Sequence, residues 1–452
     1  AIRRQRQMCI RDRNNKLRAS DIKRIADTFI KRESIPKFSR VVSREEIRCN
    51  DYNLNIPRYV DSSEAAEHWD VYASMFGGIP TAEIDEMSEF WTAFPALKKA
   101  LFTESGIPYV NVSTPDIKSA IKSHPDVVGF ENAFNAAFST FPAFLKEELI
   151  DRMGSIEISK AETVLSADIF ERLKEIPLID KYAAFQLLDD DWTGISIDLE
   201  MLQTEGFAAT KKVDPNLVIK KKDGKDQEVQ EGWVGHIIPF DLVQATLLST
   251  ETDELHGLES RLAEIPSEYE SILDEMTEED KESCNDVLTE EGDAFVPKEV
   301  SKKIKELKKD RSPESVALRT LLEKVESLIK SEKEIKAEIK AKSAALQAKT
   351  KDTIESLSDE QALDLLEKKW IAPLIESIHK LPDTVIDSLV SKIQALQNKY
   401  ATTFFEVEQQ ISETEATLSG MIDDLEGNEY DMLGLNAVSY THLRAHETGR
   451  NL

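Results

Sequence analysis

Apolar residues recur at helical spacing along most of this chain. Ile22, Ile25 and Phe29 share one face of a predicted helix over residues 21–31, with Ser20 at its N-cap. Ser43 followed three residues later by a glutamate is a capping box, which predicts a second short helix. We therefore expect the chain to begin with two amphipathic helices.

The helical pattern continues from residue 62 to about residue 155, with short loops. A Gly-Gly-Ile-Pro sequence at residues 77–80 breaks it once. Further on, five aromatic side chains step along one helical region, and this spacing is typical of a core face rather than a ligand site. They are Phe130, Phe134, Phe138, Phe141 and Phe144.

One segment departs from the helical pattern. Two β-prone runs, residues 217–220 and 228–230, flank the dipeptide Asp223-Gly224. Asp-Gly between such runs is a signal for a β-hairpin. The expected fold is therefore mainly α, with one small β-hairpin at residues 217–230 as its only clear sheet.

Two later segments carry a seven-residue apolar repeat, which is the period of a coiled coil. The first segment combines two series that step by seven residues: Leu321, Leu328 and Ile335, and Leu318, Val325, Ile339 and Leu346, the second with a gap at Glu332. The second contains Ile386, Leu389, Ile393, Leu396, Tyr400 and Val407. Two such segments joined by a shorter helical linker predict an antiparallel pair, within a helical coiled-coil arm over residues 251–438.

Charge is distributed in blocks around the first repeat. Residues 251–296 contain 17 acidic and 2 basic side chains, whereas residues 298–351 contain 16 basic and 9 acidic ones. These blocks predict complementary helices folded back on one another, or a basic arm that meets an acidic partner. Contact with nucleic acid is a less favoured reading, because glutamates are interleaved among the lysines and the net charge is −28.

Composition bounds the class of protein. Of 452 residues, 31% are charged and only 16 each are glycine and proline, which favours a helical, solvated chain. A secretory signal is not recognisable, and apolar runs are too short to span a membrane, so we expect a cytoplasmic protein with no membrane partner. Cys49 and Cys284 are far apart and lack metal-ligand spacing, so reduced thiols are expected.

The segment Asn50-Asp51-Tyr52-Asn53-Leu54-Asn55-Ile56-Pro57-Arg58-Tyr59-Val60, with its lead-in over residues 17–47, resembles the modification (M) subunit of type I restriction-modification systems. That subunit is an adenine-specific DNA methyltransferase, and the resembling segment follows its catalytic domain. The resemblance identifies Asn50, Asp51, Asn53, Asn55, Pro57, Arg58 and Tyr59 as family-motif residues. It also implies that the two N-terminal helices lie between the catalytic domain and the rest of the subunit.

A second phrase of the same family follows more than a hundred residues later, at residues 176–192. Its motif residues are Asp180, Lys181 and Tyr182. The run Asp189-Asp190-Asp191 departs from the family pattern. Three adjacent carboxylates can bind a hard cation, but further ligands at defined spacing are missing, so a solvated helix end is the favoured interpretation.

The resemblance implies that the intact subunit transfers a methyl group from S-adenosylmethionine to adenine, at sites chosen by a separate specificity subunit. This chain contains no Gly-x-Gly loop for that cofactor and no Asn-Pro-Pro-aromatic motif for a flipped adenine. We therefore expect no catalytic, cofactor-binding or metal residues here, and no activity of this fragment alone. DNA would be reached through the intact complex.

The long helices are then expected to dock the specificity subunit, and a contact with the restriction subunit is possible. The residues expected at this interface are Leu321, Val325, Leu328, Ile335, Ile339, Leu389, Ile393 and Leu396. The alternative is a free-standing, non-enzymatic coiled-coil adaptor. A start codon near residue 14 favours the adaptor, whereas an open frame that continues upstream favours the fragment.

The expected organisation has five parts. Residues 1–13 and 439–452 resemble translated sequencing-adapter sequence and are set aside. Residues 14–61 are expected to end the methyltransferase domain, and residues 62–250 to form a helical domain that contains the β-hairpin. Residues 251–438 complete the chain as the coiled-coil arm.

Overall fold

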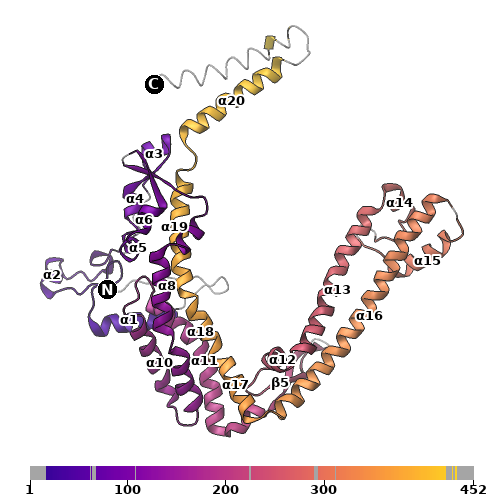
Figure 1. Ribbon diagram of the computed structural model, residues 1–452, viewed down its shortest axis with the longest axis horizontal. Helices are drawn as coiled ribbons and strands as arrows, with labels where there is room; N and C mark the ends of the chain where they lie inside the picture. Colours follow the sequence, from indigo (N-terminus) through magenta and orange to yellow (C-terminus); the bar gives the residue numbers. More distant parts are fainter. Residues whose placement is uncertain are drawn as a thin grey trace. The chain divides into compact units, whose positions relative to one another are not determined.

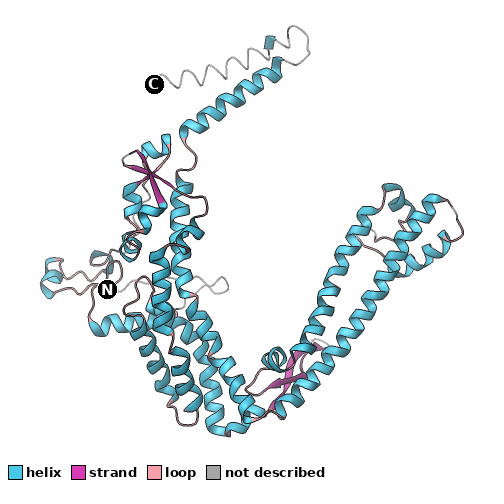
Figure 2. Cartoon of the chain, in the orientation of Figure 1, coloured by secondary structure: helices cyan, strands magenta, loops and turns pink. Residues whose placement is uncertain are grey.

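A computed structural model describes residues 17–61, 63, 68–106, 108–222, 225–289, 294–310, 312–423, 430, 433 and 434. Both adapter-like segments, residues 1–13 and 439–452, lie outside this part of the chain. The chain divides into two compact units. Unit 1 contains residues 1–144, 159–192 and 374–452, and unit 2 contains residues 145–158 and 193–373. Helices dominate both, so the expected mainly α fold is confirmed (Figure 2).

Unit 1 is built from segments of both halves of the sequence. Its helices, with those shared at its borders, are α1 (Ala19–Lys31), α2 (Arg44–Cys49), α3 (Val71–Phe76), α4 (Thr81–Asp85), α5 (Ser88–Ala93), α6 (Leu97–Leu101), α7 (Ile117–Lys122), α8 (Pro125–Phe138), α9 (Phe141–Leu145), α10 (Ile158–Arg172), α11 (Lys181–Glu205), α18 (Ala372–His379), α19 (Leu381–Lys399) and α20 (Phe404–Asp423). Residues 56–58 add a 3₁₀ turn.

The core of unit 1 contains the predicted phenylalanine stripe. Phe130, Phe134, Phe138 and Phe141 are buried, and Phe134 and Phe138 stack with their ring centroids 4.7 Å apart. The segment with the second apolar repeat, α19, lies against α7. Two ion pairs, Lys118–Asp387 at 2.8 Å and Lys122–Asp383 at 2.6 Å, flank this contact.

A second sheet, which the sequence analysis did not predict, lies in unit 1. Strands β1 (Ile79–Pro80), β3 (Tyr109–Val112) and β2 (Phe102–Gly106) pair antiparallel in that order. Gly77 and Gly78 lead into β1 with φ of 84° and 88°, a left-handed geometry that glycine adopts without strain. The expectation of a single sheet was therefore wrong, because these strands are too short to show an alternating pattern.

Unit 2 contains the end of α11, the 3₁₀ turn of residues 207–211, and α12 (Phe240–Leu247), α13 (Ser249–Glu275), α14 (Glu278–Ser283), α15 (Pro297–Leu307), α16 (Pro313–Glu355) and α17 (Asp359–Trp370). A single π-turn covers residues 146–151. The predicted β-hairpin is confirmed as β4 (Val213–Lys222) paired with β5 (Lys225–Gly235). Its tip, Asp223-Gly224, lies outside the described residues.

The helices α13 to α16, residues 249–355, form what we call the helical hairpin (Figure 1). The acidic α13 lies antiparallel to the basic α16, because Lys349 bonds to Glu251 at one end and Lys324 pairs with Glu275 at the other. A core from α13, α15 and α16 with the turn after α14 holds them together, and its buried members include Cys284, Leu322 and Val325. The predicted complementarity of the two charge blocks is thus observed.

Two further expectations are corrected by the fold. The two heptad segments do not form the expected pair, because α16 takes α13 as its partner and α19 takes α7. The helices of residues 251–438 are accordingly divided between the two units. Asp189, Asp190 and Asp191 lie in the middle of α11, not at a helix end, and burial raises the pKa of Asp189 and of Asp191.

Candidate assembly surfaces

The loop of residues 50–60, the first family motif, is held together by its own hydrogen bonds. Arg58 donates to Oδ1 of Asn50 at 3.3 Å, and the backbone N–H of Asn55 donates to Oδ1 of Asn53 at 2.9 Å. The hydroxyl of Tyr59 donates to the carbonyl of Asn53, and Tyr59 is buried. These polar motif residues therefore fix the shape of the loop.

The same loop has two consecutive non-glycine residues in the left-handed region, Asp51 at φ 53° and Tyr52 at φ 57°. Such a geometry costs free energy and persists only where surrounding contacts impose it. The result is a fixed turn that leaves apolar side chains uncovered: Tyr52 is 69% exposed and Leu54 is 71% exposed. The loop thus presents an apolar surface on a rigid backbone.

Helix α1 presents its apolar face outward. Ile22 and Phe29 are exposed to 55% and 77%, and Ile30 beside them to 76%. The opposite face, with Ser20 and Thr28 buried, lies on α10 and α11. Together with the motif loop, this face of α1 forms what we call the N-terminal apolar surface: Ile22, Phe29, Ile30, Val41, Tyr52, Leu54 and Ile56.

The second family phrase meets the lead-in of the first. The hydroxyl of Tyr182 lies 3.2 Å from Oδ2 of Asp27, and Arg24 lies 3.5 Å from Asp180. Burial, with the nearby Asp27 carboxylate, raises the pKa of Tyr182, so its phenol stays protonated. Lys181 lies over the ring of Phe170, 5.2 Å from its centroid. Segments about 150 residues apart in sequence are therefore joined at one place in unit 1.

The residues expected to dock a specificity subunit lie mostly inside the chain's own cores. Val325, Leu389 and Ile393 are fully buried, and Leu328 and Ile335 are each 9% exposed. Leu321, Ile339 and Leu396 are half-buried, Leu321 against the core of the helical hairpin. A heptad pattern does not reveal whether its partner is in the same chain, and here α13 and α7 already cover these side chains.

Helix α20 carries an apolar stripe that is not covered, and the sequence analysis included only its second member, Val407. Its spacing alternates three and four residues, as in a coiled-coil seam. Exposed side chains include Phe404 at 61%, Leu418 at 56% and Met421 at 63%. We call it the α20 seam: Phe404, Val407, Ile411, Thr414, Leu418 and Met421.

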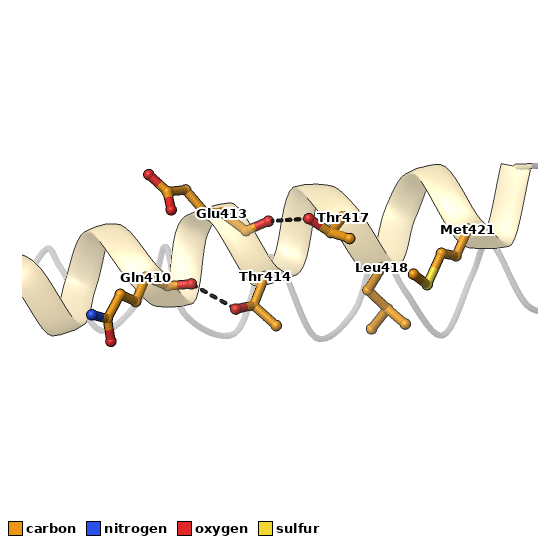
Figure 3. Close-up of a pocket in the computed structure, with 6 residues that line it drawn as sticks. All are labelled: Gln410, Glu413, Thr414, Thr417, Leu418 and Met421. Atoms are coloured by element: carbon orange, nitrogen blue, oxygen red, sulfur yellow. Dashed lines mark hydrogen bonds between the residues drawn. The ribbon is translucent and has the colours of Figure 1, made fainter.

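The far half of this seam borders a shallow groove along α20 (Figure 3). Leu418 and Met421 line it together with Gln410, Glu413, Thr414 and Thr417. The hydroxyls of Thr414 and Thr417 donate to carbonyls of the preceding turn, at 2.7 and 2.8 Å. Their polar atoms are thus satisfied within the helix, and their methyl groups add to the apolar surface.

A metal-binding site is not found in the described part of the chain. A cluster of three or more His, Cys, Asp or Glu residues arranged for a metal ion is not found among these residues. Burial raises the pKa of the Cys284 thiol, which keeps it protonated and unreactive. Nor is any described helix both long enough and apolar enough to cross a lipid bilayer.

Comparison with known proteins finds sequences similar to the N-terminal segment. Residues 2–68 match the N-6 DNA Methylase family. The "Type I restriction enzyme MjaVII methylase subunit" of Methanocaldococcus jannaschii is 48% identical over 59 residues, which are 13% of this chain and 10% of that protein. The matched segment thus spans about a tenth of the relative. No solved structure matches the chain. The resemblance expected for residues 17–60 is confirmed: residues 2–68 are similar to the N-6 DNA Methylase family, and the chain is similar over 59 residues to a type I restriction enzyme methylase subunit.

Proposed function

We propose that this chain is the C-terminal region of a type I restriction-modification DNA methyltransferase subunit and that it assembles that subunit with its specificity subunit. The intact subunit would transfer a methyl group from S-adenosylmethionine to adenine in DNA. The single observation that carries the assembly role is the exposed α20 seam. This surface replaces the buried residues of α16 and α19 as the docking site.

The geometry of α20 suits a helical partner. Its first turn is fixed by a capping box, in which the N–H of Glu406 donates to Oγ1 of Thr403 and the N–H of Thr403 donates to the Glu406 carboxylate, both at 3.1 Å. Beyond this turn the seam continues for about four helical turns with its apolar side chains exposed. Covering each large apolar side chain contributes about 1.5–3 kcal/mol, so a few of them suffice for a stable interface.

Charge on α20 further defines the partner. The sequence of α20 contains five acidic residues and no basic one, and Glu408 and Glu415 each directly follow a residue of the seam. Charged side chains beside a coiled-coil seam select partners of opposite sign. We expect the docking helices of the specificity subunit to carry lysine or arginine at their flanking positions.

The N-terminal apolar surface supports the proposal that this chain is part of a methyltransferase subunit. Large apolar side chains that are exposed to solvent on a strained loop of fixed shape are typical of a surface that another domain covers. Residues 2–68, which include this surface, match the N-6 DNA Methylase family. The catalytic domain of the intact subunit is the occupant we propose, and S-adenosylmethionine would bind there rather than to the residues described above. DNA would be engaged through the intact complex, with the restriction subunit as a possible further partner.

The docking role is tested by charge substitutions in the seam. Ile411→Asp with Leu418→Asp should abolish capture of the cognate specificity subunit, because each carboxylate would be buried without a partner. A matched control, Gln409→Asp with Ala416→Asp, adds the same charge on the face of α20 away from the seam and should retain capture within a few-fold.

Both variants should keep the circular dichroism spectrum of the unmodified chain, since all four side chains are exposed. Unchanged capture by the Ile411→Asp, Leu418→Asp variant would remove the docking role. In contrast, Leu328→Asp with Ile335→Asp is expected to unfold the helical hairpin, because both side chains lie in its interior, so lost capture there would not test docking.

A further inference from the structure

Helix α15, near the closed end of the helical hairpin, has two opposite faces. Val300 and Ile304 are fully or almost fully buried in the hairpin core. Successive lysines four, three and four residues apart lie on the other face of the helix and its closing turn. We call them the lysine stripe: Lys298, Lys302, Lys305 and Lys309, all of them exposed.

Among the residues that the structure describes, few carboxylates pair with this stripe. Lys302 pairs with Glu299 at 3.2 Å, and this bond raises the pKa of Lys302. For Lys298, Lys305 and Lys309, the described residues provide no ion-pair partner within 4 Å. Over residues 297–309 six lysines face two glutamates, a local excess of four positive charges.

The lysines of α16 differ in this respect. Lys324 pairs with Glu275, Lys342 with Glu254, and Lys336 with Glu332 of its own helix. The pairs with Glu275 and Glu254 join α16 to α13, and the pair with Glu332 lies within α16, although exposed pairs of this kind contribute little each. The charges of the lysine stripe are not used in this way and remain available to an outside anion.

We propose that the lysine stripe binds the phosphate backbone of double-stranded DNA. Residues on one helix face are about 5–6 Å apart, so the stripe presents a row of cations rather than a cluster. Duplex DNA is a linear polyanion with one charge per about 1.7 Å of axis, and it gains affinity from each lysine that replaces a condensed counterion. The contact would be independent of base sequence.

The composition of the stripe favours DNA over an acidic protein. A protein interface needs an apolar centre that is shielded from water. The exposed side chains of α15 are three lysines with Pro297 and Glu306, and none of them is large and apolar. The compact ammonium of lysine on its flexible stem suits phosphate oxygens. This contact goes beyond the proposed function, because it uses neither the catalytic domain nor the α20 seam. The net charge of −28 opposes binding, so the affinity of the chain alone will be low.

The test measures binding of the full chain to a fluorescent duplex by anisotropy, from about 20 mM to about 150 mM salt. The variant Lys298→Gln, Lys302→Gln, Lys305→Gln, Lys309→Gln removes the stripe. The control, Lys324→Gln, Lys330→Gln, Lys336→Gln, Lys342→Gln, removes the same charge from α16 lysines that have ion-pair partners. Circular dichroism checks that both variants remain folded.

We expect the stripe variant to bind at least about tenfold more weakly at the lowest salt, with the slope of log affinity against log salt lower by about 3–4. The control should lose less than about threefold. Equal losses in both variants would mean that only overall charge matters, and would overturn the proposal. So would undetectable binding of the unmodified chain, or stripe-dependent binding of a polyglutamate peptide without binding of DNA. Loss of specificity-subunit capture, in contrast, bears only on the α20 seam.

Discussion

Among single residues, Asp198 on α11 is a carboxylate that is almost fully buried. It is 6% exposed and accepts a hydrogen bond from Nε1 of Trp370 at 2.8 Å and another from Nζ of Lys369. Lys369 also donates to the carbonyl of Ile237 at 2.6 Å. One carboxylate thus ties α11, α17 and the segment after the β-hairpin together within unit 2.

Replacement of this carboxylate should be costly. Asp198→Ala removes the counter-charge of the half-buried Lys369 ammonium and leaves the buried indole N–H of Trp370 without its acceptor, so we expect the free energy of unfolding to fall by about 2–4 kcal/mol. Urea unfolding measures the effect. The control Asp364→Ala removes the partner of Lys368 in an exposed pair at 2.8 Å, and should cost less than about 1 kcal/mol. Equal losses of unfolding free energy in the two variants would show that the buried hydrogen bonds of Asp198 contribute no more than an exposed ion pair.

His236 is the residue from which we expect pH dependence. Its Nδ1 lies 2.6 Å from Asp214 and its Nε2 lies 3.2 Å from Glu205, at the base of the β-hairpin. The hydrogen bond to Asp214, and then that to Glu205, raise the pKa of His236 although burial opposes the shift. A raised folded-state pKa stabilises the fold fully below the unfolded value of about 6.5, and this contribution is lost as the pH rises through the folded-state pKa.

His236→Gln should therefore lower the urea midpoint at about pH 5.5 and leave it nearly unchanged at about pH 8.5. The parent chain should lose stability between these values more steeply than the variant. His256→Gln, an exposed change on α13, should keep the parent's pH profile. A His236→Gln profile parallel to that of the parent would contradict the role of the two carboxylates.

Among the elements, α16 depends on the core that it shares with α13 and α15. Leu322 is fully buried there, and Leu322→Ala leaves a cavity that should cost about 2–5 kcal/mol. Hydrogen exchange should accelerate across residues 249–355 together, because these helices share one core. Val316→Ala, at a 40% exposed position of the same helix, should change stability by less than about 0.5 kcal/mol. Faster exchange confined to the turn around residue 322 would show that the hairpin is not one cooperative element.

For the molecule as a whole, the division into units predicts which truncations are tolerated. Seven residues of α19 are buried in unit 1, including Ile386 and Leu389, which are fully buried. Their burial contributes about 10 kcal/mol or more, comparable with the entire stability of a domain. A chain that ends at residue 380 should therefore lose the cooperative unfolding of unit 1.

A chain that ends at residue 402 should behave differently. It keeps α19, the hydrogen bond from the hydroxyl of Tyr400 to Glu83 and the one from the N–H of Asp70 to that hydroxyl. It loses the buried Thr403, the exposed α20 and the residues that follow. Its melting temperature should lie within a few degrees of the parent value, while capture of the specificity subunit is lost. Collapse of this truncated chain would assign α20 to the fold of unit 1, and full capture would exclude α20 as the docking element.

The sequence by itself determined the local structure, because helices, caps and tight turns depend on residues a few positions apart. Ser43 caps its helix as expected, with the N–H of Glu46 donating to Oγ of Ser43 at 3.2 Å. The Glu46 carboxylate pairs with Arg40 at 2.9 Å, so the reciprocal bond of the predicted capping box does not form. The β-hairpin and the complementary acidic and basic helices were also predicted, as was the family of the N-terminal segment. The charge blocks were informative because electrostatic pairing needs no fixed register.

Only the tertiary structure decided which partner covers each apolar face. Ile22 and Phe29 on α1 show the same helical spacing as buried residues, yet they are exposed, whereas Leu389 on α19 is buried against segments of the same unit. An amphipathic pattern reports that a face tends to be covered and contains no information on the element that covers it. The uncovered faces of α1 and α20, and with them the candidate assembly surfaces, therefore followed from three-dimensional packing alone.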